Sequence, residues 1–496
     1  MTYKRAGVIA GAVLLAGCAV SPDSLTIDEI NEFTRANLQQ VVADQEPLHG
    51  SVDLYEAMSR ALKYNLDFRV AMMNEALSAR KFDLKKYDML PSLVANSGYA
   101  GRSNHSGGSS RLLLPPFTQS LAPSTSSQKN VVTADLTFSW NILDFGLSYV
   151  RAKQAANEVL IAEERRRKVV NRIIEDVRTA YWRALSAQRL VGALSRLRHR
   201  VERALRNSRH LAASGQAEPL TAMTYERELV GIKKQIRELQ RDLKTARMQL
   251  AALMNVPPGT RFRLRDTRRS RASLRIRTST KQMIATALRN RPELREAAIR
   301  KRIDLQEADA ALLELLPGAN IYATANLDTN DFLFHNNWLS WGAKASWNVM
   351  RLFAYPTKKA SIEARSELSH QRALALTMAV MTQVYVARAK YANARYVLNA
   401  AREYYNVQRR ILRQVKARAA NDAAGEQTVI REEMNTLVAA ARYDIAYADL
   451  QNAYANIYAS MGLDPYAKGI STKESVGALA RSLRRLWVER GARSGA

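Results

Sequence analysis

The sequence is poor in cysteine and in the residues that interrupt helices. Its 496 residues include 21 glycines, 13 prolines and 1 cysteine. So few helix breakers favour long helices. Because Cys18 is the single cysteine, a disulfide framework is excluded, and so is thiol chemistry in the rest of the chain. No stretch beyond the N-terminus reaches about 18 consecutive apolar residues, so we expect no transmembrane helix.

Acidic residues are scarce relative to basic ones. The chain has 46 Asp and Glu against 75 Lys and Arg, which gives a formal net charge of +29. Such an excess suits nucleic acid, an anionic membrane surface or anionic cargo.

The N-terminus predicts export. Lys4 and Arg5 precede a short apolar run at 6–16, as in a secretory signal peptide. Residues 15–18, Leu-Ala-Gly-Cys, match a bacterial lipobox, so we expect a signal peptide at 1–17 and lipidation of Cys18, for instance with palmitate. Ala19 in place of Asp favours the outer membrane. The alternative is an ordinary cleavage site with an accidental cysteine. An exported chain has no nucleic-acid partner.

An internal repeat organises the chain, and it predicts the fold. Each copy reads helix, proline, strand, loop, strand, long helix, break and long helix. The matched segments are 61–67 with 287–293, 89–91 with 315–317, 138–141 with 345–348, and 253–255 with 460–462.

Helical periodicity predicts two very long hairpins. Short helices at 53–90 and 280–316 end at prolines. The first hairpin runs from 146 to 213, roughly 100 Å of helix, and returns to about 255 after a break at 214–219. The second runs over 357–420 and returns to 461. A coiled-coil seam is expected at Ile173, Val177, Ala180, Ala184, Ala187, Val191 and Leu194.

Four segments alternate between apolar and polar residues, as barrel strands do: 93–101, 131–140, 319–327 and 339–348. Asp135 and Lys344 lie on the polar side and are candidate lumen residues. Trp140, Trp338, Trp341 and Trp347 would suit the aromatic girdles or the lipid face. Because four strands cannot close a barrel and open edges are not tolerated in lipid, this interpretation requires oligomerisation. A sheet half-buried against the helices is the alternative.

From about 50 to 465 the layout resembles the TolC-like outer membrane factor family. The resemblance rests on the duplication, the Ala-Leu-x-x-Asn-Leu-Asp start at 61–67, the Leu-Pro at 90–91, the tip glycine Gly215, and Met-Gly-Leu-Asp-Pro at 461–465. It implies a homotrimer with one shared barrel of four strands from each copy. It also implies a periplasmic coiled-coil tunnel, a periplasmic adaptor protein and an inner-membrane transporter. The tips depart from the family pattern at Ala217 and Asp422.

No catalytic constellation is evident, so we expect no enzyme, cofactor or metal. The 6 histidines are scattered without metal-ligand spacing. The residues singled out are the expected periplasmic tips, where one acid per copy becomes a ring in a symmetric oligomer. Gly215, Glu218, Asp422 and Glu426 are the candidate gate and adaptor site. Helix capping alone is an equally good explanation for Asp422 and Glu426.

The expected organisation has six parts. They are the signal peptide 1–17, a lipid-anchored extension 18–50, a first repeat 51–255, a basic linker 256–279, a second repeat 280–465 and a basic tail 466–496. The linker and the tail are expected to be a solvated, partly disordered belt rather than a grip for an acidic partner or cell-wall polymer.

The function expected from this sequence is a passive outer-membrane exit duct of a tripartite efflux or secretion system. It would be anchored in the outer membrane by lipid and would have a long periplasmic extension. One alternative is a type I secretion or polysaccharide-export duct of the same fold. Another is a lipid-anchored periplasmic coiled-coil scaffold without a pore.

Overall fold

The computed structural model describes residues 23–43, 45–48, 50–109, 111–119, 122–214, 218–257, 259–265, 276, 278–421, 425–463 and 474–493. The predicted signal peptide 1–17, Cys18, Gly215 and Asp422 lie outside these residues. Within the described ranges, no helix is both long and apolar enough to cross a membrane.

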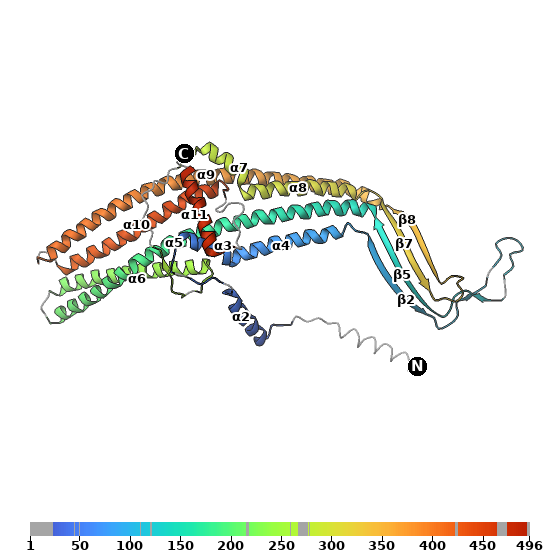
Figure 1. The fold of residues 1–496 in the computed structure, drawn as a ribbon, viewed down its shortest axis with the longest axis horizontal. Helices are drawn as coiled ribbons and strands as arrows, with labels where there is room; N and C mark the ends of the chain where they lie inside the picture. Colours follow the sequence, from blue (N-terminus) through green and yellow to red (C-terminus); the bar gives the residue numbers. More distant parts are fainter. Residues whose placement is uncertain are drawn as a thin grey trace.

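The elements follow the chain in the order of the repeat (Figure 1). The first part contains α2 (Ile27–Val41), β1 (Ser51–Val52), α3 (Leu54–Tyr64), α4 (Leu66–Tyr87), β2 (Ser92–Gly101), β3 (Gly107–Gly108), β4 (Ser124–Thr125), β5 (Asn130–Asn141), α5 (Ile142–Ala213) and α6 (Pro219–Leu253). The second contains β6 (Arg263–Leu264), α7 (Thr280–Asn290), α8 (Pro292–Leu313), β7 (Gly318–Asp328), β8 (Asn337–Ser346), α9 (Met350–Ala419), α10 (Glu426–Ser460) and α11 (Val476–Arg493).

The two copies of the repeat agree closely in their element boundaries. The bounds of α7 and α8 are those of α3 and α4 shifted by 226 residues, and α10 is α6 shifted by 207 residues. The helix ends agree as well. Asn255 and Gly462 occupy equivalent positions just after α6 and α10, and both have a positive φ, +57° and +68°. This left-handed residue is a common way to end a helix. The predicted duplication is confirmed.

The expected single helices at 53–90 and 280–316 are each two helices. Breaks at Asn65 and Arg291 have nearly the same backbone angles, φ −62° and ψ 128° against φ −64° and ψ 127°. Asn65 caps α4 by accepting a hydrogen bond from the backbone N–H of Phe68. In the second copy, Pro292 stands in the first turn of α8. Hydrophobic periodicity continues across such a kink and therefore does not reveal it.

The molecule is long, with its helices running lengthwise from a sheet at one end (Figure 1). At one end a single antiparallel sheet has the strand order β2-β5-β7-β8. Each strand joins one helix, so α4, α5, α8 and α9 form a row in that order, with α4 and α9 at its edges. Beyond the middle, α5 with α6 and α9 with α10 form two hairpins whose tips lie at the far end.

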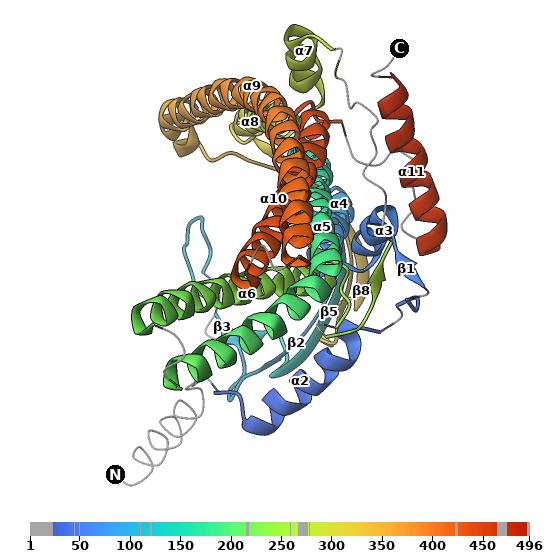
Figure 2. The ribbon, with the colours of Figure 1, turned by 90° about the vertical axis from the view of Figure 1, so that its left-hand side faces the viewer.

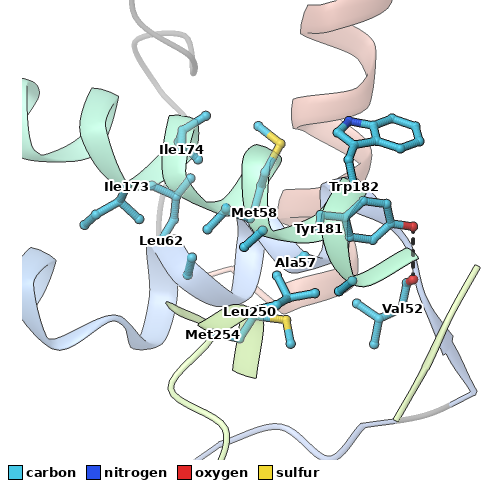
Figure 3. Packing of buried hydrophobic residues seen from close by; sticks show 14 of the residues in the cluster. Val52, Ala57, Met58, Leu62, Ile173, Ile174, Tyr181, Trp182, Leu250 and Met254 are labelled. Atoms are coloured by element: carbon cyan, nitrogen blue, oxygen red, sulfur yellow. Dashed lines mark hydrogen bonds between the residues drawn. The ribbon is translucent and has the colours of Figure 1, made fainter. Parts of the chain in front are cut away.

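The middle of the molecule, here called the waist, holds the largest core. Figure 3 shows Ala57, Met58 and Leu62 of α3 facing Ile173, Ile174 and Tyr181 of α5, with Leu250 and Met254 alongside. The Tyr181 hydroxyl donates to the backbone carbonyl oxygen of Val52 at 3.4 Å. Because β1 pairs with β6 in parallel, the start of the first repeat is joined to the linker at this point.

The predicted solvated belt is wrong for the described parts of the linker and tail. Phe262 and Leu264 of the linker are buried. In the tail, α11 lies against α3, and its Leu479, Leu483 and Trp487 are buried in the waist core. The apolar column of α11 is difficult to recognise in the sequence because arginines surround it. On a helix that is buried on one side only, these long side chains extend their charged groups into solvent.

The predicted seam of α5 is correct except at one position. Ile173, Val177, Ala180, Ala184, Ala187 and Leu194 are buried, whereas 43% of Val191 is exposed. Below the waist, α5 packs against α6 and α10 together, because a second core joins Leu194 and Val201 to Ile236 and to Met434.

The two-faced sheet and the helical tips as candidate functional site

The sheet has one polar face, and its register gathers polar side chains into rows. Asp135 of β5 lies between Asn96 of β2 and Asn326 of β7. The Asn96 amide donates to Asp135 Oδ2 at 2.9 Å, and Thr137 Oγ1 donates to the same oxygen at 3.0 Å. Asn326 donates onward to Ser340 Oγ at 3.0 Å. The face is therefore a hydrogen-bonded polar surface that water can wet.

Lys344 of β8 lies on the same face, two strands from Asp135 of β5. It is the register partner of Asn320, which in turn pairs with Asn141. Lys344 is exposed, so its charge faces solvent on the side of Asp135. The two candidate lumen residues thus share one face of the sheet, as the alternation predicts.

The opposite face is apolar and exposed. Its members come from all four strands and alternate with the polar set. They include Leu93, Val132, Leu136, Phe138, Trp140, Ile321, Leu327, Leu339 and Trp341, each at least 38% exposed. No helix covers this face in the part of the chain that the structure describes. An apolar surface of this extent marks contact with another protein or with lipid.

Two tryptophans differ from the prediction. Trp338 is the register partner of Asn326 and therefore lies on the polar face, not on the apolar one. Trp347 lies after the end of β8, where its indole N–H donates to the carbonyl oxygen of Leu315 at 2.8 Å. Only Trp140 and Trp341 belong to the apolar face.

Both edges of the sheet are open. In the strand order, β2 is paired only with β5, and β8 only with β7. Each outer edge therefore presents unpaired backbone N–H and C=O groups. The edge helices also carry exposed apolar side chains: Val70, Met73, Leu77 and Leu84 on α4, and Leu368 and Leu374 on α9.

At the tips, the structure places two of the four predicted residues. Glu218 precedes α6 and accepts a hydrogen bond from Thr221 Oγ1 at 2.7 Å without capping the helix. Glu426 is the first residue of α10, and its carboxylate lies 3.9 Å from Arg200 Nε. Glu426 also lines a cavity of about 710 Å³ with Leu211, Leu220 and Tyr225.

A polar network that the sequence did not reveal links the two hairpins near the tips. Glu228 of α6 accepts hydrogen bonds from Gln427 and, at 3.3 Å, from Arg431 of α10. Arg200 of α5 donates to Glu433 of α10 at 2.7 Å. These residues occupy unrelated positions in the repeat, so no shared spacing could identify them.

The Tyr225 hydroxyl beside this network is held in its neutral form. Burial raises the pKa of the Tyr225 hydroxyl, and the negative charges of Glu426 and Glu228 raise it further. Among the described side chains, no group of three or more His, Cys, Asp or Glu is placed to hold a metal ion.

Comparison with known proteins gives a family model and several solved structures. Residues 57–256 match the family described as outer membrane efflux protein. No curated protein matches the chain by sequence.

Among solved structures, the chain is similar to the outer membrane channel CmeC of Campylobacter jejuni, with 12% identity, a TM-score of 0.67, and coverage of 93% of this chain and 97% of that one. The outer-membrane channel OprN is 16% identical, with a TM-score of 0.63 and coverage of 82% and 89%. The open state of the MtrE outer membrane channel of Neisseria gonorrhoeae is 16% identical, with a TM-score of 0.63 and coverage of 83% and 89%.

The family model covers most of the first repeat, and the solved channels share the fold over most of the chain. Residues 57–256 therefore match the outer membrane efflux protein family, and the chain has the fold of a TolC-like outer membrane factor.

Proposed function

We propose that three copies of this chain form the outer-membrane exit duct of a tripartite efflux system. The observation that carries the proposal is the four-stranded sheet with one polar face, one exposed apolar face and two open edges. In lipid, such edges must be paired and only the apolar face can point outward.

Ring closure follows from strand direction. Because neighbouring strands of the sheet alternate in direction, β8 of one copy is antiparallel to β2 of the next. Three copies supply twelve strands, enough for a barrel with a polar lumen. Asp135 and Lys344 would then line that lumen, and the apolar columns of α4 and α9 would meet between copies.

The barrel would place the helices in the periplasm, with the tips directed at the inner membrane. Lipidation of Cys18 would anchor each N-terminus in the outer membrane, in addition to the barrel. A periplasmic adaptor protein would bind the tips, and an inner-membrane transporter would supply the energy. The duct itself would conduct passively and carry out no chemistry.

We also propose that the tips form the gate. Gly215, Glu218, Asp422 and Glu426 would surround the mouth of the tunnel, where acids repeated by symmetry form a ring. The ion pair of Arg200 with Glu433 and the contacts of Glu228 hold the two hairpins of one copy together. Opening the mouth requires the hairpins to move apart, so these pairs favour the closed state.

The test of the duct is single-channel conductance of the detergent-extracted protein in a planar bilayer, with the oligomeric mass measured in parallel. A trimer with discrete conductance steps is expected. A secretion or export duct of the same fold would conduct as well. Deleting this protein from cells and identifying the cargo that is no longer exported would distinguish such a duct from an efflux duct. A monomer that stays silent even when the tip pairs are removed by Arg200→Ala and Glu228→Ala would contradict the proposal and favour a scaffold without a pore.

The test of the gate uses Glu426→Ala and Asp422→Ala. If these acids hold the mouth closed, each substitution raises the resting conductance and the sensitivity of cells to antibiotics. Glu363→Ala, an exposed acid of α9 far from the tips in sequence, is the matched control. Unchanged conductance and sensitivity in both tip variants would leave helix capping as the role of these acids.

A further inference from the structure

The helix α2 has a complete apolar column that no described residue of its own chain buries. Ile27, Ile30, Phe33, Leu38 and Val41 share one side of the helix and are 77%, 47%, 69%, 68% and 38% exposed. No residue of α2 is buried. An isolated helix of this length, 15 residues, is marginal in water, even with the capping box that joins Thr26 to Glu29. The apolar column therefore indicates a binding surface.

The position of α2 indicates where that surface lies. At the C-terminal end of the helix, the Asn255 side chain donates to the carbonyl oxygen of Val41 at 2.6 Å, which holds α2 at the waist. Figures 1 and 2 both show α2 beyond α4 and α6, on the side of the molecule away from α9. In the proposed ring, the α4 edge of one copy faces the next copy, and the α9 of that next copy lies there.

At the level of the waist, α9 offers a matching surface. Met378, Tyr385, Ala389, Ala392 and Tyr396 recur at spacings of three, four and seven residues, which places them along one side of the helix. The large ones are 64%, 58% and 74% exposed for Met378, Tyr385 and Tyr396. The opposite side of α9, with Val380, Val384, Ala387, Tyr391 and Ala394, is buried in its own core. The two alanines leave room for a second helix to approach closely.

The charges of the two helices are complementary. The residues of α2 include three acids, Asp28, Glu29 and Glu32, and one base, Arg35. By contrast, α9 carries 14 Lys and Arg against 3 Asp and Glu. Arg388 and Arg395 flank the exposed stripe of α9 on one side and Lys390 on the other, and all three are exposed. Opposite charge favours this pairing over binding of the acidic helix to an anionic membrane surface.

We propose that α2 of each copy binds to the exposed stripe of α9 on the neighbouring copy, so that an N-terminal arm straps adjacent copies together at the waist. The proposal rests on the ring of the proposed function. It adds a contact separate from the barrel and from the α4 and α9 columns, and it assigns an occupant to α2, which has no buried residue in its own chain.

The test is cross-linking between two differently tagged copies produced in the same cells. One copy carries Phe33→Cys and the other Ala389→Cys, and a short bis-maleimide joins them. Because the chain has 1 natural cysteine, the wild-type pair gives the background. Phe33 has no role in the protomer core, so its substitution leaves the fold intact. A product that contains both tags is expected.

Two controls make the outcome decisive. Gln39→Cys lies on the polar side of α2 and is expected to give no product with Ala389→Cys. Leu77→Cys on α4 with Leu368→Cys on α9, both exposed and outside the stripe, reports the ring itself. If the ring pair is linked and the Phe33 pair is not, α2 binds elsewhere, for example to lipid, and the strap is overturned while the duct stands. If neither pair is linked, the ring and the strap both fail.

Discussion

The helices α5 and α9 hold equivalent places in the two repeats, yet they differ sharply in burial. Of the 72 residues of α5, 23 are buried, whereas 6 of the 70 residues of α9 are. Tyr181 is fully buried at the waist, and its counterpart Arg388 is exposed. Arg178 is buried, and its counterpart Tyr385 is 58% exposed. The two repeats therefore have the same backbone arrangement but differ in burial. In the row of α4, α5, α8 and α9, the helix α5 lies inside and forms the core, whereas α9 lies at the edge.

The largest expected effect comes from truncating the two counterparts. Tyr181→Ala removes a fully buried ring and its hydrogen bonds, and it should lower the free energy of unfolding by about 3–5 kcal/mol. Arg388→Ala should change it by no more than about 0.5 kcal/mol. Thermal unfolding in detergent measures both. Equal losses at the two positions would show that α9 is as well packed as α5, contrary to the comparison.

A second substitution concerns α11, which packs on α3 and α5 of the first repeat and meets Tyr458 of α10. Trp487 of α11 lies 4.6 Å from the guanidinium of Arg178, whose pKa burial lowers to about 10. Trp487→Ala should cost up to about 3–5 kcal/mol, less if α11 detaches alone. Hydrogen exchange should show faster exchange in α11 and α3 and no change in α9. Arg485→Ala, on the exposed side of α11, is the control.

The smallest expected effect is a pH dependence of the contact between Glu46 and the start of α11. The hydrogen bond from Lys63 lowers the pKa of Glu46 below its ordinary value of 4.5, against the opposing effect of burial. Glu46 also accepts from the backbone N–H of Val476 at the start of α11. The folded state therefore binds this proton less readily than the unfolded state. The stabilisation is present above pH 4.5 and is lost as the pH falls through the folded pKa. Glu46→Gln should remove the pH dependence of hydrogen exchange in α11 between the folded pKa and pH 4.5. If the variant keeps the pH dependence of the wild type, other groups cause it.

The sequence predicts the parts of the fold that repeat. The duplication, the hairpins and the alternation around Asp135 and Lys344 all follow from periodicity, and the structure agrees with them. Periodicity does not reveal features that occur once or that interrupt it. The kink at Asn65 depends on one side-chain cap, β1 and β6 are two residues long, and α11 is defined by three apolar side chains among arginines.

The candidate site likewise has one part that the sequence predicts and one part that it does not. Alternation identifies the polar face, the candidate lumen face, because it is a local property of each strand. The contacts of Glu228 with Gln427 and Arg431 join residues about 200 positions apart, and only the packing of one hairpin on the other brings them together. Trp338 lies outside the predicted strand 339–348 but inside β8, where alternation with Leu339 places it on the polar face and not on the lipid face.

The open edges of the sheet also bear on how the protein reaches its destination. A copy that crosses the periplasm alone exposes two unpaired strands and an apolar face, which are the features that template aggregation. Edge pairing with the wrong copy would produce an open chain of sheets instead of a closed ring. Assembly of the proposed trimer therefore requires that newly exported copies are kept apart, or that their sheets are shielded, until lipid and two correct neighbours are at hand.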